Sequence, residues 1–192
     1  CNRMCPSYIA LHGYDGTGGR VGAANVPAEY RMLTVKSSPA RDAQVDAYKI
    51  VDVYVSMFAD QFNPDAERIK SLYLYSAEPG TGKTTTAAAI INAYLTAHYI
   101  GSIQRGLAPV ERPAYFWDFN GFNRPRVPDD IAAPAAARYY RTMEIAKHVP
   151  FLVADDIGVR DATDAFRADL HTVINERAVN GLPTVYTSNV PM

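Results

Sequence analysis

Apolar and polar residues along this chain follow two alternating patterns. Short, nearly continuous apolar runs have the length of strands that are covered on both faces. They span residues 71–76, 114–119, 151–154 and 184–187. Between them lie longer segments in which apolar residues recur at helical spacing. Because strands and helices alternate, the pattern predicts an α/β fold with a parallel central sheet and flanking helices.

Apolar stripes and end signals locate the helices. A first helix is expected over 43–62, ahead of Asn63-Pro64, with a stripe of Ala47, Ile50, Val51, Tyr54, Val55 and Phe58. An Ala-rich helix follows the first strand, with a stripe of Ala87, Ile90, Ile91, Tyr94 and Leu95. Two later helices are expected over 131–148 and from a Thr163 cap to Gly181.

Two segments show neither a continuous apolar run of strand length nor apolar residues at helical spacing. Residues 12–27 hold five glycines, and we interpret them as a turning connector. A dinucleotide-binding loop is disfavoured there, because no strand precedes the segment and no helix pattern opens from it. Residues 120–130, with Pro125 and Pro128, are expected to form an exposed loop.

Composition narrows the class of protein. The chain of 192 residues is 48% hydrophobic and 20% charged, which is typical of a globular domain. Its net charge of −1 excludes a global attraction to nucleic acid or to an acidic membrane, so any nucleic-acid contact must be local. No apolar run approaches the length of a membrane span, and the start does not resemble a secretory signal. We therefore expect a cytoplasmic protein.

The two cysteines allow two interpretations of their role. Cys1 and Cys5 are the two cysteines, which excludes a disulfide framework. They could be half of a zinc site whose other ligands lie upstream, or two ordinary thiols.

The segment between the first strand and the Ala-rich helix has the pattern of a phosphate-binding loop. Gly80 and Gly82 let backbone N–H groups approach phosphate, Lys83 supplies positive charge, and the Thr84 hydroxyl can reach magnesium. The nucleotide-binding residues are expected to be Glu78, Pro79, Gly80, Thr81, Gly82, Lys83, Thr84 and Thr85. Ala77 stands where the pattern has its first glycine. The opposing interpretation, a Gly-rich turn that binds nothing, gives the Lys-Thr pair no purpose.

An acidic pair follows the third apolar run. Asp155 would hold magnesium, and Asp156 would orient or deprotonate the attacking water. Two exposed aspartates at a strand end are the alternative. After the next strand, Asn189 could hold that water or the γ-phosphate, although an Asx turn before Pro191 would explain the same residues.

Three blocks of the sequence resemble the DnaC/DnaI helicase-loader family, and phage-encoded members most. These blocks are residues 72–85, 149–158 and 174–189, and the resemblance extends from Asn25 to the end. It implies an AAA+ ATPase of the P-loop class, with the phosphate-loop strand central in the sheet and Asn189 as the first sensor. Pro27 and Tyr30 match the short segment that the family places beside adenine.

The same resemblance implies cofactors and partners. ATP or ADP would bind with Mg²⁺, Lys83 and Thr84 would hold phosphate and metal, and Asp155 and Asp156 would form the acidic pair. The implied function is the loading of a DnaB-type replicative helicase onto single-stranded DNA during DNA replication, by a homo-oligomer in the host bacterial cytoplasm. Residues 1–24 would be a linker or the remnant of a helicase-binding domain, and 25–192 the AAA+ core.

The family continues past the sensor with another strand, a trans-acting arginine and a lid, whereas this chain stops at Met192. We therefore expect a core truncated before these parts, which binds nucleotide but hydrolyses it slowly. Arg177 would be the residue to examine if turnover were fast.

Two other functions share some of these features. An IstB-like transposition helper ATPase has the same blocks, and a P-loop small-molecule kinase has the same loop. The acidic pair followed by Thr187-Ser188-Asn189 fits water attack better than transfer to a small molecule. Contact with DNA could come from a group of basic and aromatic residues, for which a solvated helix face with packed tyrosines is the alternative. The group comprises Arg124, Arg126, Arg138, Tyr139, Tyr140 and Arg141.

Overall fold

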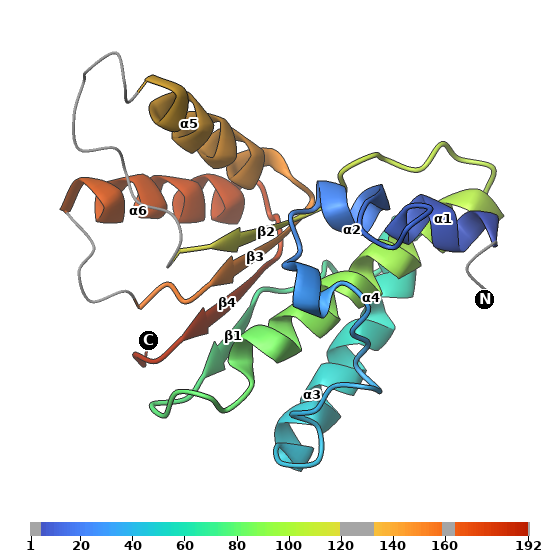
Figure 1. Ribbon diagram of the computed structural model, residues 1–192, viewed down its shortest axis with the longest axis horizontal. Helices are drawn as coiled ribbons and strands as arrows, with labels where there is room; N and C mark the ends of the chain where they lie inside the picture. The colour runs from blue at the N-terminus through green and yellow to red at the C-terminus, as the bar shows by residue number, and fades with distance from the viewer. Residues whose placement is uncertain (1–4, 120–132, 159–163, 192) are drawn as a thin grey trace.

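A four-stranded parallel sheet forms the centre of the protein (Figure 1), as seen in a computed structural model that describes residues 5–119, 133–158 and 164–191. The strands are β1 (Leu72–Tyr75), β2 (Ala114–Asp118), β3 (Phe151–Asp155) and β4 (Thr184–Ser188). Their order in the sheet is β1-β4-β3-β2, and all pairs are parallel. The four predicted strands and the parallel α/β architecture are confirmed.

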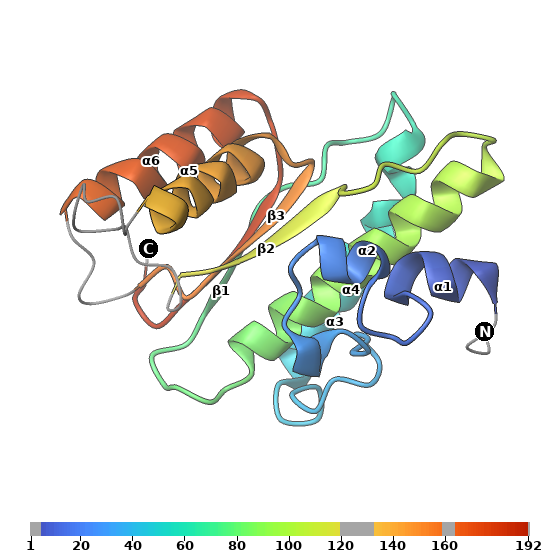
Figure 2. The ribbon, with the colours of Figure 1, turned by 45° about the horizontal axis from the view of Figure 1, so that its top comes forward.

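Helices cover both faces of this sheet (Figure 2). On one face lie α5 (Ala133–His148) and α6 (Asp164–Val179), and on the other α3 (Val45–Ser56) and α4 (Lys83–Gln104). Alternate residues of β3 pack against the helices on opposite faces of the sheet, because successive side chains of a strand point to opposite faces. Phe151 and Val153 join the core beneath α4, whereas Leu152 and Ala154 join the core beneath α5 and α6. This explains why the strand is apolar throughout.

The predicted helix over 43–62 exists, and Val51, Tyr54 and Phe58 of the predicted stripe are buried as expected, but the stripe is shifted at its start. Its buried side chains are Tyr48, Val51, Tyr54 and Phe58, whereas Ala47 is exposed and Ile50 is 62% exposed. Tyr48 and Tyr54 turn inward because their hydroxyls have partners there, at Thr86 Oγ1 (3.0 Å) and the Lys70 carbonyl (2.8 Å). The last part is a 3₁₀ helix, η2 (Met57–Phe62).

The phosphate-loop strand is not central in the described sheet, which corrects that expectation. β1 pairs with β4 along one edge only. Side chains of α3, including the exposed Ala47 and Ile50, line a groove beside the other edge. Because that edge has no neighbouring strand within the described residues, β1 is less buried than β3.

The glycine-rich segment is more ordered than a connector. It contains the end of α1 (Pro6–His12) and all of α2 (Gly19–Ala23), and η1 (Ala28–Tyr30) follows. Leu11, Val21 and Ala24 are buried in the same core as α4. The outer edge of β2 is closed here, because Phe116 N–H donates to the Ala24 carbonyl over 2.7 Å. The prediction of a loop was therefore wrong for α2. The helices in the described ranges are all too short or too polar to cross a lipid bilayer.

Candidate functional site

The loop between β1 and α4 needs glycine at two positions for conformational reasons. Gly80 and Gly82 have φ of +74° and +87°, in the left-handed region that favours glycine. At Gly82 an added Cβ would also overlap the Cβ of Ala40. Gly82 immediately precedes α4, which begins at Lys83. The unpaired N–H groups and partial positive charge of that helix end therefore lie next to the loop.

Lys83 is held by the loop itself. Its Nζ donates to the carbonyl oxygens of Ser76 (3.2 Å) and Glu78 (3.0 Å). These are hydrogen bonds to neutral acceptors, which an anionic phosphate oxygen could replace with stronger ones. The ammonium group is thus kept at the site without an acidic partner from the loop.

One cavity of about 310 Å³ brings most of the predicted site residues together. It is lined by Tyr30, Pro79, Gly80, Gly82, Lys83, Thr84, Thr85, Asp156, Thr187 and Asn189. These residues come from η1, from the loop and first turn of α4, and from the ends of β3 and β4. They meet because the carboxyl ends of parallel strands share one edge of the sheet, where ligands bind in open α/β folds.

Asp155 lies directly behind this cavity in a short hydrogen-bond network. Thr84 Oγ1 donates to Asp155 Oδ2 over 3.0 Å, and Thr187 Oγ1 donates to Asp155 Oδ1 over 2.7 Å. The Thr187 hydroxyl in turn accepts from the Asp156 N–H over 2.8 Å. Two hydroxyls thereby fix the carboxylate beside the start of α4. The donor set, a carboxylate with a threonine hydroxyl, is of the type that Mg²⁺ uses together with phosphate oxygens.

The Asp155 carboxyl is 5% exposed, and burial is the main reason that its pKa is raised above 3.8. The nearby carboxylates of Asp118 and Asp156 raise the pKa further, while the hydrogen bonds from Thr187 and Thr84 lower it. A bound cation would relieve both the burial penalty and the carboxylate repulsion. The described residues include no cluster of three or more His, Cys, Asp or Glu for a metal, so a cation here would depend on ligand oxygens.

Asp156 has a strained backbone, with φ of +56°. A non-glycine residue in the left-handed region is uncommon, and aspartate tolerates it better than most. The conformation turns the chain at the end of β3, and Asp156 lines the cavity there together with the exposed Asn189.

Four predicted residues do not line this cavity, and one of them, Asp155, lies behind it. Pro27 lies one turn before Tyr30, whose N–H donates to the Pro27 carbonyl over 2.9 Å. Glu78 contributes its carbonyl oxygen to Lys83, and Thr81 lines the groove beside β1. The site residue not predicted is Thr187, although it belongs to the Thr187-Ser188-Asn189 block. Its position at a strand end was the available signal, but its contact with Asp155 joins residues 32 positions apart.

Arg177 does not belong to this site and is a structural residue. It is 1% exposed, and burial lowers its pKa to about 10. Its guanidinium donates four hydrogen bonds of 2.7–2.8 Å, to Thr184 Oγ1 and to the carbonyls of Ala146, Val149 and Pro183. All lie near the amino end of the sheet, opposite the cavity. Arg177 is therefore excluded as an arginine that reaches a neighbouring subunit.

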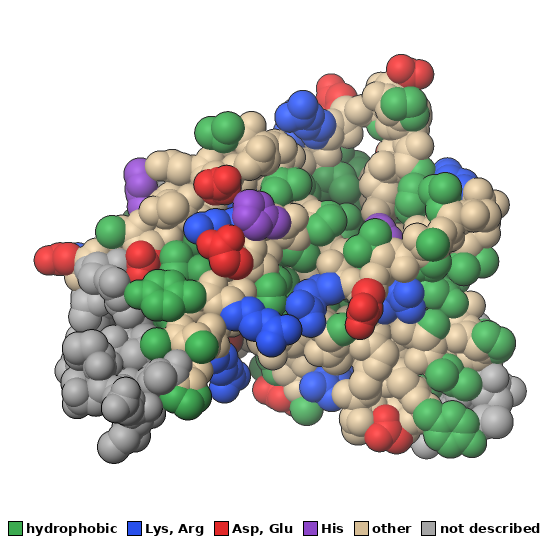
Figure 3. All heavy atoms as spheres, turned by 90° about the horizontal axis from the view of Figure 1, so that it is seen from above, with side chains coloured by type: hydrophobic (Ala, Val, Ile, Leu, Met, Phe, Trp, Pro, Cys, Tyr) green, Lys and Arg blue, Asp and Glu red, His purple; other side chains and the backbone are tan. Residues whose placement is uncertain are grey.

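The residues considered for DNA contact fall into a buried residue, exposed residues and residues outside the described ranges. Tyr139 is 2% exposed and its hydroxyl donates to Asp169 over 2.8 Å, so it is a packed residue, as the alternative interpretation has it. Arg138, Tyr140 and Arg141 are exposed on α5. Arg124 and Arg126 lie outside the described residues, as does Cys1 of the cysteine pair. Figure 3 shows basic and acidic side chains interspersed with hydrophobic atoms over one face of the molecule.

Comparison with solved structures finds a similar fold in two proteins. A candidate primosome component from Streptococcus pyogenes serotype M3 is 25% identical, with a TM-score of 0.53 over 87% of this chain and 74% of that one. DnaI is 20% identical, with a TM-score of 0.54 over 86% of this chain and 76% of that one. The chain has the fold of DnaI.

This result confirms the P-loop fold that the resemblance to the DnaC/DnaI family implied. Neither structure bears on a phage origin, which stays a prediction. No protein-family model matches the chain, and no curated protein sequence matches it.

Proposed function

We propose that this protein is an ATP-binding helicase loader of the DnaC/DnaI type, which uses the nucleotide to control a DnaB-type replicative helicase. The observation that carries the proposal is the hydrogen bond between Thr84 and Asp155 beside Lys83. It joins the phosphate loop to the acidic strand end, which P-loop ATPases require for a magnesium nucleotide.

The residues of the cavity would divide the work. Lys83 would leave the Ser76 and Glu78 carbonyls to bind phosphate, and the first N–H groups of α4 would bind the same group. Thr84 and Asp155 would hold Mg²⁺, which neutralises charge on the phosphates when bound. Asp156 and Asn189, which line the cavity together with Thr187, would orient the attacking water. Tyr30 also lines the cavity and would contact the part of the nucleotide beyond the loop.

The loader role is supported by the two structural neighbours, one a candidate primosome component and the other DnaI. Partners of the proposed activity are the helicase, single-stranded DNA and further copies of the chain. ATP hydrolysis would reset the switch.

The test is capture of the helicase. The protein would be immobilised and incubated with the DnaB-type helicase of the host, with ATP, with ADP and without nucleotide. We expect capture that depends on the nucleotide, and loss of that dependence in Lys83→Ala. Lys49→Ala is the matched control, because Lys49 in α3 is 72% exposed and does not line the cavity. Helicase capture that is absent under all conditions, while nucleotide still binds, would refute the loader role but retain the ATP site.

A further inference from the structure

A row of three buried hydroxyl groups leads to the phosphate loop without lining the candidate nucleotide cavity. The groups belong to Ser38, Tyr48 and Thr86, which are 6%, 1% and 6% exposed. Tyr48 OH lies 3.0 Å from Thr86 Oγ1, and it also shares a hydrogen bond with the Ser38 hydroxyl. The row ends at the loop, where Thr86 Oγ1 donates to the Gly82 carbonyl over 2.8 Å.

The last acceptor sets the direction of every hydrogen bond in this row. A carbonyl oxygen only accepts, so the single hydroxyl proton of Thr86 points to Gly82. Thr86 Oγ1 must therefore accept from Tyr48, and Tyr48 OH must accept from Ser38. Hydrogen bonds that run in one direction polarise one another, which strengthens the last bond, the one to Gly82.

Gly82 is the residue whose orientation matters for phosphate binding. It immediately precedes α4, and its carbonyl also accepts from the Thr86 N–H over 2.8 Å. In a planar trans peptide group, the C=O and N–H bonds point in opposite directions. Because the Gly82 carbonyl is held toward Thr86, the Lys83 N–H points back toward the loop, as phosphate binding at a helix start requires.

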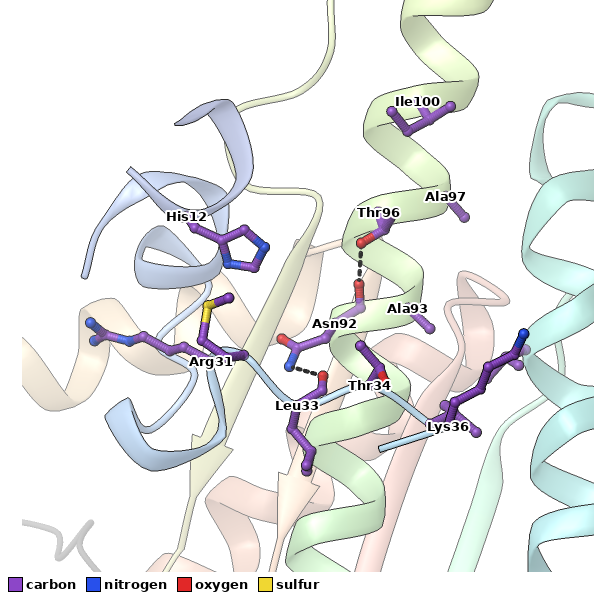
Figure 4. A pocket seen from close by; sticks show the side chains of 13 residues that line it. His12, Arg31, Leu33, Thr34, Lys36, Asn92, Ala93, Thr96, Ala97 and Ile100 are labelled. Carbon is purple, nitrogen blue, oxygen red and sulfur yellow. Dashed lines mark hydrogen bonds between the residues drawn. The ribbon is translucent and has the colours of Figure 1, made fainter. Parts of the chain in front are cut away.

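The segment that carries Ser38 also contacts Gly82 directly. Near the start of this segment, Asn92 Nδ2 of α4 donates to the Leu33 carbonyl over 2.8 Å (Figure 4). Farther along, Ala40 lies against the loop so closely that a Cβ added to Gly82 would overlap the Ala40 Cβ. Gly82 is therefore held by the methyl group of Ala40 and by the hydroxyl row together.

We propose that Tyr48 is a positioning residue for the nucleotide, whose hydroxyl acts through Thr86 to hold the Gly82 carbonyl and so orders the phosphate loop before ATP binds. A loop that is already ordered loses less conformational freedom on binding, which raises the affinity. This inference rests on the proposed ATP site, and it adds to that site a residue of α3 that does not touch the nucleotide.

The test is the affinity for ATP, measured by calorimetry in Tyr48→Phe. The substitution keeps the ring but removes the donor to Thr86, so we expect the affinity to fall about fivefold, the effect of about one hydrogen bond. Tyr54→Phe is the matched control. Tyr54 is buried on the same helix, but its hydroxyl donates to the Lys70 carbonyl over 2.8 Å. This control should lose similar stability and keep its ATP affinity within about twofold.

Thr86→Val tests the same link from its other end, since valine has nearly the shape of threonine but no hydroxyl. It should lower ATP affinity by a similar factor, and Tyr48→Phe added to it should cause no further loss, because both act through one row of hydrogen bonds. Parent-like affinity in either single variant, an equal fall in Tyr54→Phe, or fully additive losses in the double variant would overturn this inference alone. A parent protein that binds no ATP would refute the nucleotide site, and this inference with it.

Discussion

Each end of the sheet contains a buried charged residue, but the surroundings compensate the charge of one residue and not of the other. At the amino end, Arg177 has four hydrogen-bond acceptors around it and is 1% exposed. At the carboxyl end, Asp155 receives two hydroxyl donors and has two further carboxylates nearby, so its charge is undercompensated. A buried charge that the protein neutralises serves stability, whereas a buried carboxylate near other carboxylates is suited to binding a cation.

The amino end should show the largest effect on folding. Arg177→Met keeps much of the side-chain volume but removes the guanidinium donor from the buried Ala146 and Val149 carbonyls, and leaves the Pro183 carbonyl with the Leu152 N–H alone. We expect the free energy of unfolding to fall by about 3–5 kcal/mol, the usual cost of breaking a buried polar network. Urea denaturation measures it. Arg167→Met, at a 61% exposed position of the same helix, is the control and should change it by less than about 0.5 kcal/mol. Equal losses in both variants would contradict the structural role.

At the carboxyl end, Lys83→Ala should affect binding and spare stability. The charge-assisted hydrogen bonds that Lys83 would make to phosphate would be lost, so we expect ATP affinity to fall about 100-fold or more. Calorimetry measures the affinity, with Lys49→Ala as the control. Since Lys83 bonds only loop carbonyls and a threonine hydroxyl in the described structure, the unfolding free energy should stay nearly constant. A variant that binds ATP like the parent would remove the phosphate site from consideration.

Asp156→Asn tests chemistry apart from binding. Asparagine accepts the left-handed backbone at this position, so the turn after β3 should persist. Loss of the water-orienting carboxylate should slow ATP turnover by about tenfold or more while the affinity for ATP stays within about twofold. Steady-state ATP hydrolysis measures this, with the DnaB-type helicase of the proposed function added. Turnover equal to that of the parent would assign Asp156 to the turn alone.

The smallest change in the free energy of unfolding is expected for Asp155→Asn in the absence of nucleotide. The sign of this change distinguishes the carboxyl end of the sheet from the amino end. The folded-state pKa of Asp155 lies above 3.8, so the folded protein binds this proton more tightly than the unfolded chain does. That contribution to stability is complete below the unfolded pKa and is lost as pH rises through the folded pKa.

Asp155→Asn should therefore be as stable as the parent or slightly more so at pH 7, by up to about 1 kcal/mol. The difference should vanish toward pH 3.5, and the variant should lose the Mg²⁺ dependence of ATP binding. Urea denaturation across this pH range checks the sign, with Asp46→Asn at an exposed position of α3 as the control. A variant that is clearly less stable at pH 7 would mean that Asp155 is compensated in the way Arg177 is.

Local patterns predicted the parts of the site that are continuous in sequence. The loop from Pro79 to Thr84 has its glycines where left-handed turns occur, and α4 follows at Lys83 as expected. Asp155 and Asp156 end an apolar strand, as their position indicated. The inward side of α3 was predicted at Val51 and Tyr54 but not at Tyr48, which turns inward because its hydroxyl has a partner at Thr86 in α4.

By itself, the sequence determined the alternation of strands and helices, the phosphate loop and the acidic strand end, because each depends on residues close together in the chain. Only the tertiary structure decided that Thr187 holds Asp155, that Arg177 is interior and that Asn92 Oδ1, among the residues the structure describes, is a buried acceptor without a donor. Each of these depends on which groups from distant parts of the chain surround one side chain. Burial of that side chain and the hydrogen bonds that it makes are decided by these contacts, and periodicity along the chain carries no information about them.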